Sequence, residues 1–150
     1  MEASKTLALI RSMRHDFGNH LQIINGYSEL GYLDEVKAYI SQIVEEMNQE
    51  RLLFELKSPE LSLYLLQQKS LLQSIGVILK YDVIEIVGTE HLVEQFDFMS
   101  TVQSLLGEQR YNEVRILVSI YELEDQIKLV FDSKQPIGNL KDFYIKKDKC

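Results

Sequence analysis

A histidine near the start of the chain is the residue whose type and surroundings best suit chemistry. His15 is followed directly by Asp16 within the segment RHDFGNHL, residues 14–21. An exposed imidazole has a reference pKa of about 6.5, so it is partly neutral at cellular pH and can act as a nucleophile. The Asp16 carboxylate can accept a proton from one ring nitrogen and leave the other nitrogen to attack. Such a pair suits phosphoryl transfer, in which the protein mainly positions the reacting groups.

The spacing of apolar residues predicts that a long helix over residues 4–30 carries this histidine. Apolar residues recur at steps of three or four, which is helical rather than strand spacing. They are Ile10, Met13, Phe17, Leu21, Ile24 and Tyr27. At ~100° per residue, Met13 and Phe17 fall within roughly 20° of the side opposite His15. We therefore expect His15 at the centre of the polar face, although position alone does not distinguish it from one more solvated polar residue.

The face that carries His15 is small and polar. Asn19 follows one turn later, close enough to share a ligand with His15. Gly18 removes bulk where another surface would have to approach. Other residues lie within roughly 40° of His15 around the helix, namely Arg11, Gln22 and Gly26.

The other two histidines do not complete a metal site. His20 lies roughly 40° from the middle of the apolar face, so we expect it to pack at the edge of the helical seam. His91 lies in a polar, loop-like stretch with no partner at ligand spacing. The single cysteine, Cys150, is the last residue, which excludes an internal disulfide and fits a reducing cytoplasm.

The overall composition excludes two classes of partner. The 150-residue chain has 16 basic and 23 acidic residues, for a net charge of -7. An acidic chain without a basic patch does not suit binding to nucleic acid or to an anionic membrane. No signal peptide is visible and no apolar run approaches ~18 residues, so we expect a cytoplasmic protein that does not span a membrane.

A second periodic run predicts a helical hairpin over residues 1–57. Gly31 ends the first helix, and Asp34 can help to start the second by capping or by charge. Two long helices joined by a few residues form an antiparallel hairpin. A lone hairpin leaves its apolar seam partly uncovered, so we expect two copies to form a four-helix bundle as a homodimer.

Residues 58–150 predict a separate α+β domain, with helices on one face of a mostly antiparallel sheet. Ser58 can cap a helix that begins at Pro59. After Pro136 the chain turns polar, and we expect it to be poorly ordered. The predicted elements are a helix over 61–74, one or two strands over 77–87, a helix over 96–106, and strands over 114–121 and 127–131.

The motif around His15 resembles that of a known family. It reads Arg14-His15-Asp16-x-x-Asn19-x-Leu21-Gln22-x-Ile24. It is similar to the phosphoacceptor helix of sporulation initiation phosphotransferase B and of the related citrate/malate-type sensor kinases. The resemblance is close over residues 11–55, and beyond them the elements follow in the same order. The motif is moderately specific, because similar strings recur in several classes of histidine kinase.

The resemblance implies a role for each residue of the motif. His15 would be phosphorylated, within a dimer whose hairpins form a four-helix bundle. Arg14, Asp16 and Asn19 match flanking motif positions and would support His15 or help a partner to dock. Residues Arg11, Gly18 and Gln22, on the same face, would also contact the partner. In this family the partners are receiver domains of response regulators, and a receiver domain supplies its own Mg²⁺.

Residues 58–150 would correspond to the ATP-binding domain of such a kinase, in degenerate form. The helix expected to supply Asn for Mg²⁺ contains none over residues 98–106. Asp132 is present, but the close glycines that allow a backbone to approach a nucleotide are missing from residues 131–138. We therefore expect no ATP binding, no cofactor and no metal of the protein's own.

These observations favour a phosphorelay phosphotransferase, an enzyme that works through a phosphohistidine at His15. It would take a phosphoryl group from one response regulator and pass it to another. The alternative is a dimeric scaffold or inhibitor that binds a kinase or regulator without being phosphorylated. An ATP-dependent autokinase with a cryptic nucleotide site is a third hypothesis.

Overall fold

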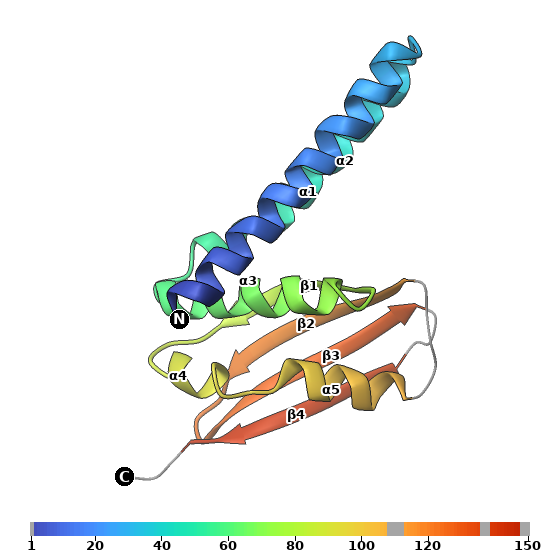
Figure 1. Ribbon diagram of the computed structural model, residues 1–150. Helices are drawn as coiled ribbons and strands as arrows, with labels where there is room; N and C mark the ends of the chain where they lie inside the picture. Colours follow the sequence, from blue (N-terminus) through green and yellow to red (C-terminus); the bar gives the residue numbers. More distant parts are fainter. Residues whose placement is uncertain (1, 108–112, 136–138, 148–150) are drawn as a thin grey trace. The chain divides into compact units, whose positions relative to one another are not determined.

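The computed structural model describes residues 2–107, 113–135 and 139–147 (Figure 1). The chain separates into two compact units, residues 1–51 and 52–150, which we call the helical unit and the sheet unit. This division falls near the end of a helix, whereas the boundary predicted from the sequence lies at the next helix cap. Cys150 and the Pro136–Gly138 segment lie outside the described residues.

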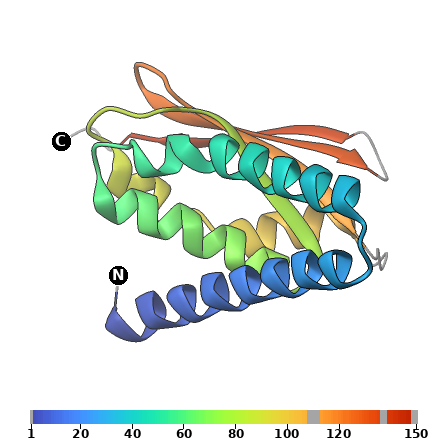
Figure 2. The same cartoon turned by 90° about the horizontal axis from the view of Figure 1, so that it is seen from above.

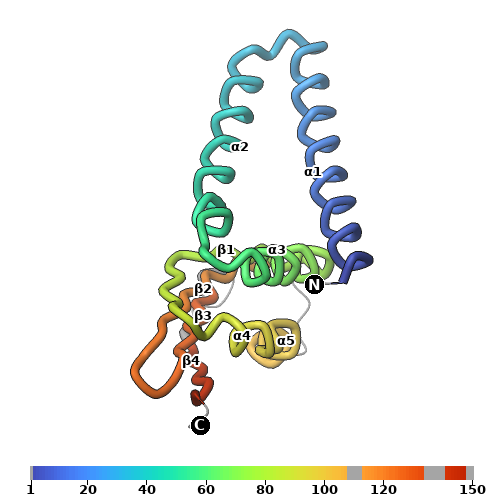
Figure 3. The backbone as a smooth tube through the Cα atoms, turned by 90° about the vertical axis from the view of Figure 1, so that its left-hand side faces the viewer, coloured from blue at the N-terminus to red at the C-terminus, as the bar shows by residue number. Residues whose placement is uncertain are grey.

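The helical unit is an antiparallel hairpin, as predicted. Helix α1 spans Ala3–Glu29 and helix α2 spans Leu33–Phe54; they run in opposite directions from a common turn (Figures 2 and 3). Gly31 adopts φ 75°, a left-handed conformation that suits glycine. The Tyr32 amide donates to the Tyr27 carbonyl at 2.9 Å, which closes the helix end. Asp34 lies inside the first turn of α2, so it favours that helix through its charge rather than as a cap.

Most of the apolar stripe of α1 is exposed to solvent. Phe17 is 63% exposed, and Ile10 54%. Residues on another side of the helix, including Leu9 and His20, are more covered. The apolar stripe is made up of Leu7, Ile10, Met13, Phe17 and Leu21. A single hairpin therefore leaves its most hydrophobic helical surface in water.

The first helix of the sheet unit forms as its cap signals predict. Helix α3 spans Pro59–Gln73, and the Ser58 hydroxyl accepts a hydrogen bond of 3.2 Å from the Leu61 amide. Proline suits the first helical position because its missing amide proton would have no partner there. The inward residues are the four leucines expected from the periodicity, Leu61, Leu65, Leu66 and Leu72.

Four strands form one sheet in the order β1-β2-β3-β4. Strand β1 runs parallel to β2, whereas β2–β3 and β3–β4 are antiparallel, so the sheet is mostly antiparallel as predicted. Helices α3, α4 and α5 lie on one face of it (Figure 1). The strands span Val77–Glu85 (β1), Val114–Glu122 (β2), Gln126–Gln135 (β3) and Asn139–Lys146 (β4).

The helix predicted over residues 96–106 is present, and a short helix that was not predicted precedes it. Helix α4 spans Glu90–Val93 and helix α5 spans Phe98–Leu106. The Asp97 carboxylate accepts a bond of 2.9 Å from the Ser100 amide and so fixes the start of α5. Phe98 is fully buried against the sheet, in ring contact with Phe131 of β3.

Tyrosine hydroxyls join α3 to its neighbours. Tyr81 of β1 donates to the Leu65 carbonyl at 2.9 Å, and Tyr64 of α3 donates to the Phe96 carbonyl. Burial, followed by the nearby Asp97 and Glu94 carboxylates, raises the pKa of Tyr64 to about 12. The Tyr64 hydroxyl therefore stays protonated and can donate its hydrogen bond to the Phe96 carbonyl.

The expectation of a poorly ordered tail was wrong for residues 139–147. Strand β4 pairs with β3, with Phe143 opposite Leu129 and Ile145 opposite Ile127. These two apolar side chains share a sheet face with buried residues of β3, while Tyr144 between them faces the other side. An edge strand with one solvated face therefore reads as polar in the sequence.

Candidate functional site

Helix α1 holds the His15 side chain in solvent. The side chain is 76% exposed, which confirms its predicted placement on the polar face. Phe17, nearly opposite His15 around the helix, belongs to the exposed apolar stripe. The helical period thus separates the polar face that carries His15 from a hydrophobic one.

Two side chains lie near the same nitrogen of His15. The Asn19 amide nitrogen is 3.4 Å from Nδ1, and Asp16 Oδ1 is 3.8 Å from it. The second distance is longer than a hydrogen bond, so Asp16 acts on the ring mainly through its charge. Within the described residues, both contacts of His15 involve Nδ1. The other ring nitrogen, Nε2, therefore points away from Asn19 and Asp16.

The hydrogen-bonding role of Nδ1 depends on the tautomer of His15. With the Asn19 amide nitrogen as donor, Nδ1 accepts and the proton resides on Nε2. If the amide of Asn19 is turned over, its oxygen accepts a hydrogen bond from the N–H at Nδ1 instead, and Nε2 presents a lone pair. The negative charge of Asp16 favours the second arrangement because it attracts a proton to Nδ1. That arrangement is the nucleophilic one.

The remaining predicted site residues lie on the same helix. Arg11, Arg14 and Gln22 are exposed on α1. A Cβ atom built on Gly18 would meet nothing within 4 Å, and the same holds for Gly26. Among the described residues, no contact therefore accounts for either glycine, and each costs the helix about 1 kcal/mol relative to alanine. The use of Gly18 in docking stays a prediction.

His20 lies at the seam between the helices, as predicted, and its partner there is Tyr39 of α2. The Tyr39 hydroxyl is 2.6 Å from His20 Nδ1, and the centroids of the two rings are 5.7 Å apart. Partial burial, followed by the Glu46 carboxylate and Tyr27, raises the pKa of Tyr39. The phenol therefore stays protonated at neutral pH and can donate a hydrogen bond to Nδ1 of His20.

Sequence reasoning missed Tyr39 as a residue that bears on the site. It was placed only on the flank of the second periodic run. Positions about equally far from the turn meet across an antiparallel hairpin, and Tyr39 and His20 are such positions on either side of Gly31. This approximate symmetry about the turn could have identified the Tyr39–His20 pair from the sequence.

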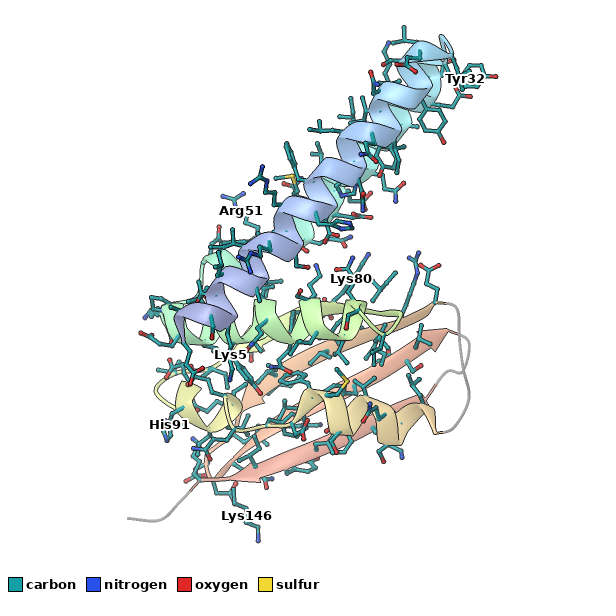
Figure 4. All side chains as sticks on the ribbon, in the orientation of Figure 1. Lys5, Tyr32, Arg51, Lys80, His91 and Lys146 are labelled. Atoms are coloured by element: carbon teal, nitrogen blue, oxygen red, sulfur yellow. The ribbon has the colours of Figure 1, made fainter. Side chains whose placement is uncertain are left out.

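The sheet unit contributes no metal site in the described part of the chain, where no three His, Cys, Asp or Glu side chains cluster. Helix α5 carries no asparagine, and Asp132 is half-buried on β3. His91, predicted in a loop, lies exposed on α4 (Figure 4). Ser133 is buried, and its hydroxyl is unpartnered among the described atoms.

Comparison with known families identifies the helical part of the chain. Residues 1–56 match the family Sensor kinase SpoOB-type, alpha-helical domain. This match confirms the resemblance stated from the His15 motif and connects the protein with two-component signalling. A search among curated proteins found no match. Across the residues that the structure describes, no helix is both long and apolar enough to cross a membrane.

Proposed function

We propose that this protein is a phosphorelay histidine phosphotransferase in which His15 carries the phosphoryl group. The observation that carries the proposal is the exposed His15 ring, with both neighbouring polar groups at Nδ1 and Nε2 open to a partner. The match of residues 1–56 to the SpoOB-type sensor kinase family, a family of two-component signalling, supports this proposal.

The reaction begins when Nε2 of His15 attacks the phosphorus of an aspartyl phosphate on a receiver domain. The N–P bond forms as the P–O bond to the aspartate breaks, and the aspartate leaves as a carboxylate. A second receiver aspartate then attacks the same phosphorus, and the N–P bond breaks. The Mg²⁺ of the receiver neutralises charge on the migrating group. No redox step and no nucleotide are needed.

Asp16 supports both half-reactions by attracting a proton to Nδ1. In the first, this proton position frees the Nε2 lone pair to attack. In the second, a protonated Nδ1 makes the imidazole a better leaving group, because the ring departs as a neutral species. Asn19 holds the ring plane through its contact with Nδ1. Arg11, Arg14, Gly18 and Gln22 form the surface that the receiver approaches.

The active species is a homodimer built on the helical unit. The apolar stripe of α1 is exposed in one copy, and a second hairpin can cover it. Two hairpins then form a four-helix bundle with His15 on its outer, polar side. This arrangement leaves each His15 accessible to a receiver.

The sheet unit supports the phosphotransferase rather than an autokinase. It has a four-stranded sheet with helices on one face, which is compatible with a degenerate kinase domain. Its helix α5 carries no asparagine for a nucleotide-bound Mg²⁺. We therefore expect no binding of ATP by calorimetry, and the phosphoryl group must come from another protein.

The decisive experiment is incubation with a phosphorylated receiver protein. We expect the wild-type chain to gain acid-labile phosphate at His15, detected by mass spectrometry, and to pass it to a second receiver. A His15→Ala variant should gain none. If the wild type gains no phosphate, or if the variant gains as much as the wild type, the proposal is wrong.

The same variant separates the phosphotransferase from a scaffold. A scaffold or inhibitor would act by binding alone, so His15→Ala would preserve its effect on the kinase or regulator. A phosphotransferase loses signal flow in this variant while it still binds the receiver. Measuring receiver binding and phosphate flow on the same sample distinguishes the two hypotheses.

A further inference from the structure

We infer that Tyr39 is a positioning residue for phosphotransfer, acting through its hydrogen bond to His20. The inference deepens the proposed function and rests on it. Tyr39 lies on α2, and its hydroxyl is 2.6 Å from Nδ1 of His20 on α1. This bond joins the helix that carries the reactive histidine to the other helix of the hairpin.

The hydrogen bond fixes the rotation of α1 about its own axis, which apolar packing alone leaves variable. Apolar contact is non-directional, and much of the apolar stripe of α1 is exposed within a single hairpin. A hydrogen bond is directional and weakens steeply away from its preferred angle. The Tyr39–His20 bond therefore selects one rotation of α1 about its own axis.

That rotation determines where His15 points. His20 follows His15 by five positions, which places the two side chains ~140° apart around the helix. When His20 faces α2, His15 must face away from α2. Asp16 lies only ~40° from His20 around the helix and is correspondingly more covered than His15, at 40% against 76% exposure.

A protein partner is sensitive to this rotation, whereas a small phosphoryl donor is not. A helix with its side chains is ~10–12 Å across, so a receiver domain that reaches His15 also touches surface beyond α1. Rotation of α1 changes how His15 is presented relative to that surface. Phosphoramidate, a small donor that exchanges its N–P bond for one to the histidine, needs only an accessible ring nitrogen.

The ionisation of the pair is compatible with this role. Tyr39 keeps its proton at neutral pH, because its pKa is raised. The groups around the pair are Glu46 of α2 and Tyr27 of α1. The hydroxyl is therefore available to donate its hydrogen bond to Nδ1 of His20.

The test compares two donors on the full chain carrying Tyr39→Phe. This variant retains the ring and loses only the hydroxyl. We expect transfer from a phosphorylated receiver to slow by about tenfold, the loss that corresponds to one part-buried hydrogen bond. Labelling by phosphoramidate should stay within about twofold of the wild type, since the His15 ring itself is unchanged.

Matched variants test whether the bond itself is responsible. Tyr32→Phe removes a half-exposed hydroxyl at the hairpin turn (Figure 4) and should behave like the wild type with both donors. His20→Ala should slow receiver transfer as Tyr39→Phe does. His20→Asn retains a hydrogen-bonding atom near the place of Nδ1 and should restore most of the rate. Circular dichroism of each variant checks that the helices are intact.

Two results would overturn the inference. In the first, Tyr39→Phe transfers from the receiver as fast as Tyr32→Phe. In the second, the Tyr39→Phe variant is slowed equally with the receiver and with phosphoramidate. That result would mean that the hydroxyl affects folding or the chemistry of the His15 ring rather than the way His15 is presented. Failure of the proposed function gives a different pattern, because the wild type itself would then take no phosphate from the receiver.

Discussion

At His15, the nearby groups supply orientation and only a modest electrostatic effect. Asp16 lies 3.8 Å from Nδ1, and both side chains have substantial contact with water. Exposed ion pairs contribute about 0.2–1 kcal/mol, which corresponds to a rate factor of about five at most. In the proposed reaction, these groups alone are too weak to supply the full catalytic effect. The proposal therefore assigns most of it to the receiver and the metal ion that the receiver would hold.

Gly18 provides a test of the docking surface at single-residue scale. We expect Gly18→Ala to stabilise the helical unit by about 1 kcal/mol, because alanine favours a helix interior and its methyl group meets open space. We also expect receiver transfer to slow by about fivefold, because a methyl group added to a close interface costs on the order of 1 kcal/mol. Thermal unfolding and transfer rates measure the two effects.

Gly26→Ala is the matched control for this prediction. Gly26 lies on the same face of α1, and a methyl group there also meets open space. It is ~16 Å along the helix from His15, whereas Gly18 is only ~5 Å along. The control should gain the same stability with little loss of rate. Equal rates in both variants would show that the receiver does not approach Gly18 closely.

At the scale of elements, Glu122 holds three parts of the sheet unit together. Its carboxylate ends strand β2 and accepts hydrogen bonds from the Val87 amide at 2.7 Å and the Thr89 hydroxyl at 2.6 Å. Lys147, just beyond β4, lies 3.4 Å from the same carboxylate. Only 14% of the Glu122 side chain is exposed. One side chain thus fastens the loop before α4 and the end of β4 to the sheet.

We predict a pH-dependent loss of stability when this carboxylate is changed. The hydrogen bond from Thr89, followed by those from Val87 and Lys147, outweighs the effect of burial and lowers the pKa of Glu122 below 4.5. A lowered pKa stabilises the fold fully above the unfolded value, and this contribution is lost as pH falls through the folded value. Glu122→Gln should therefore cost about 1 kcal/mol at pH 7, and the difference should shrink below about pH 4.5.

Denaturant unfolding of wild type and variant at pH 7 and pH 3.5 measures this difference. Glu124→Gln, an exposed change in the neighbouring turn, serves as the control. A constant difference between wild type and Glu122→Gln across this range would show that the charge of Glu122 does not contribute. A loss as large in Glu124→Gln would point to net charge instead.

At the scale of the whole molecule, an exposed hydrophobic stripe runs along α1. Isolated apolar side chains on a surface are common, but a contiguous row is typical of an interface. The row on α1 repeats at steps of three or four residues, as in a helix that packs in a bundle. This pattern is the physical basis of the proposed homodimer.

Phe17→Glu tests that assembly. Burying a phenylalanine contributes about 2 kcal/mol, and a symmetric dimer buries two of them. We expect the dissociation constant of the dimer to rise by about three orders of magnitude, because each 1.4 kcal/mol is about tenfold. Sedimentation velocity at micromolar concentration should change from dimer to monomer.

Val87→Glu introduces the same charge at an exposed apolar residue of the other unit. Val87 is 78% exposed in the sheet unit. The control should sediment like the wild type. A wild-type monomer at all accessible concentrations would contradict the homodimer, and an unchanged dimer in Phe17→Glu would place the interface elsewhere.

The sequence by itself determined the features that depend on local spacing and local chemistry. The helical period placed His15 opposite Phe17, and the Ser58-Pro59 pair predicted the start of α3. Alternation predicted strands β2 and β3. These features follow from geometry within a few residues of the chain, so they need no knowledge of the rest of the fold.

Only the tertiary structure decided which distant residues meet. It paired Tyr39 with His20, brought Val87 and Lys147 to Glu122, and joined β4 to β3. The edge strand was missed because half of its residues face solvent, so its alternation looked like a polar tail. Contacts between residues far apart in the sequence depend on how complete helices and strands pack. The secondary-structure propensity of a short segment does not determine that packing.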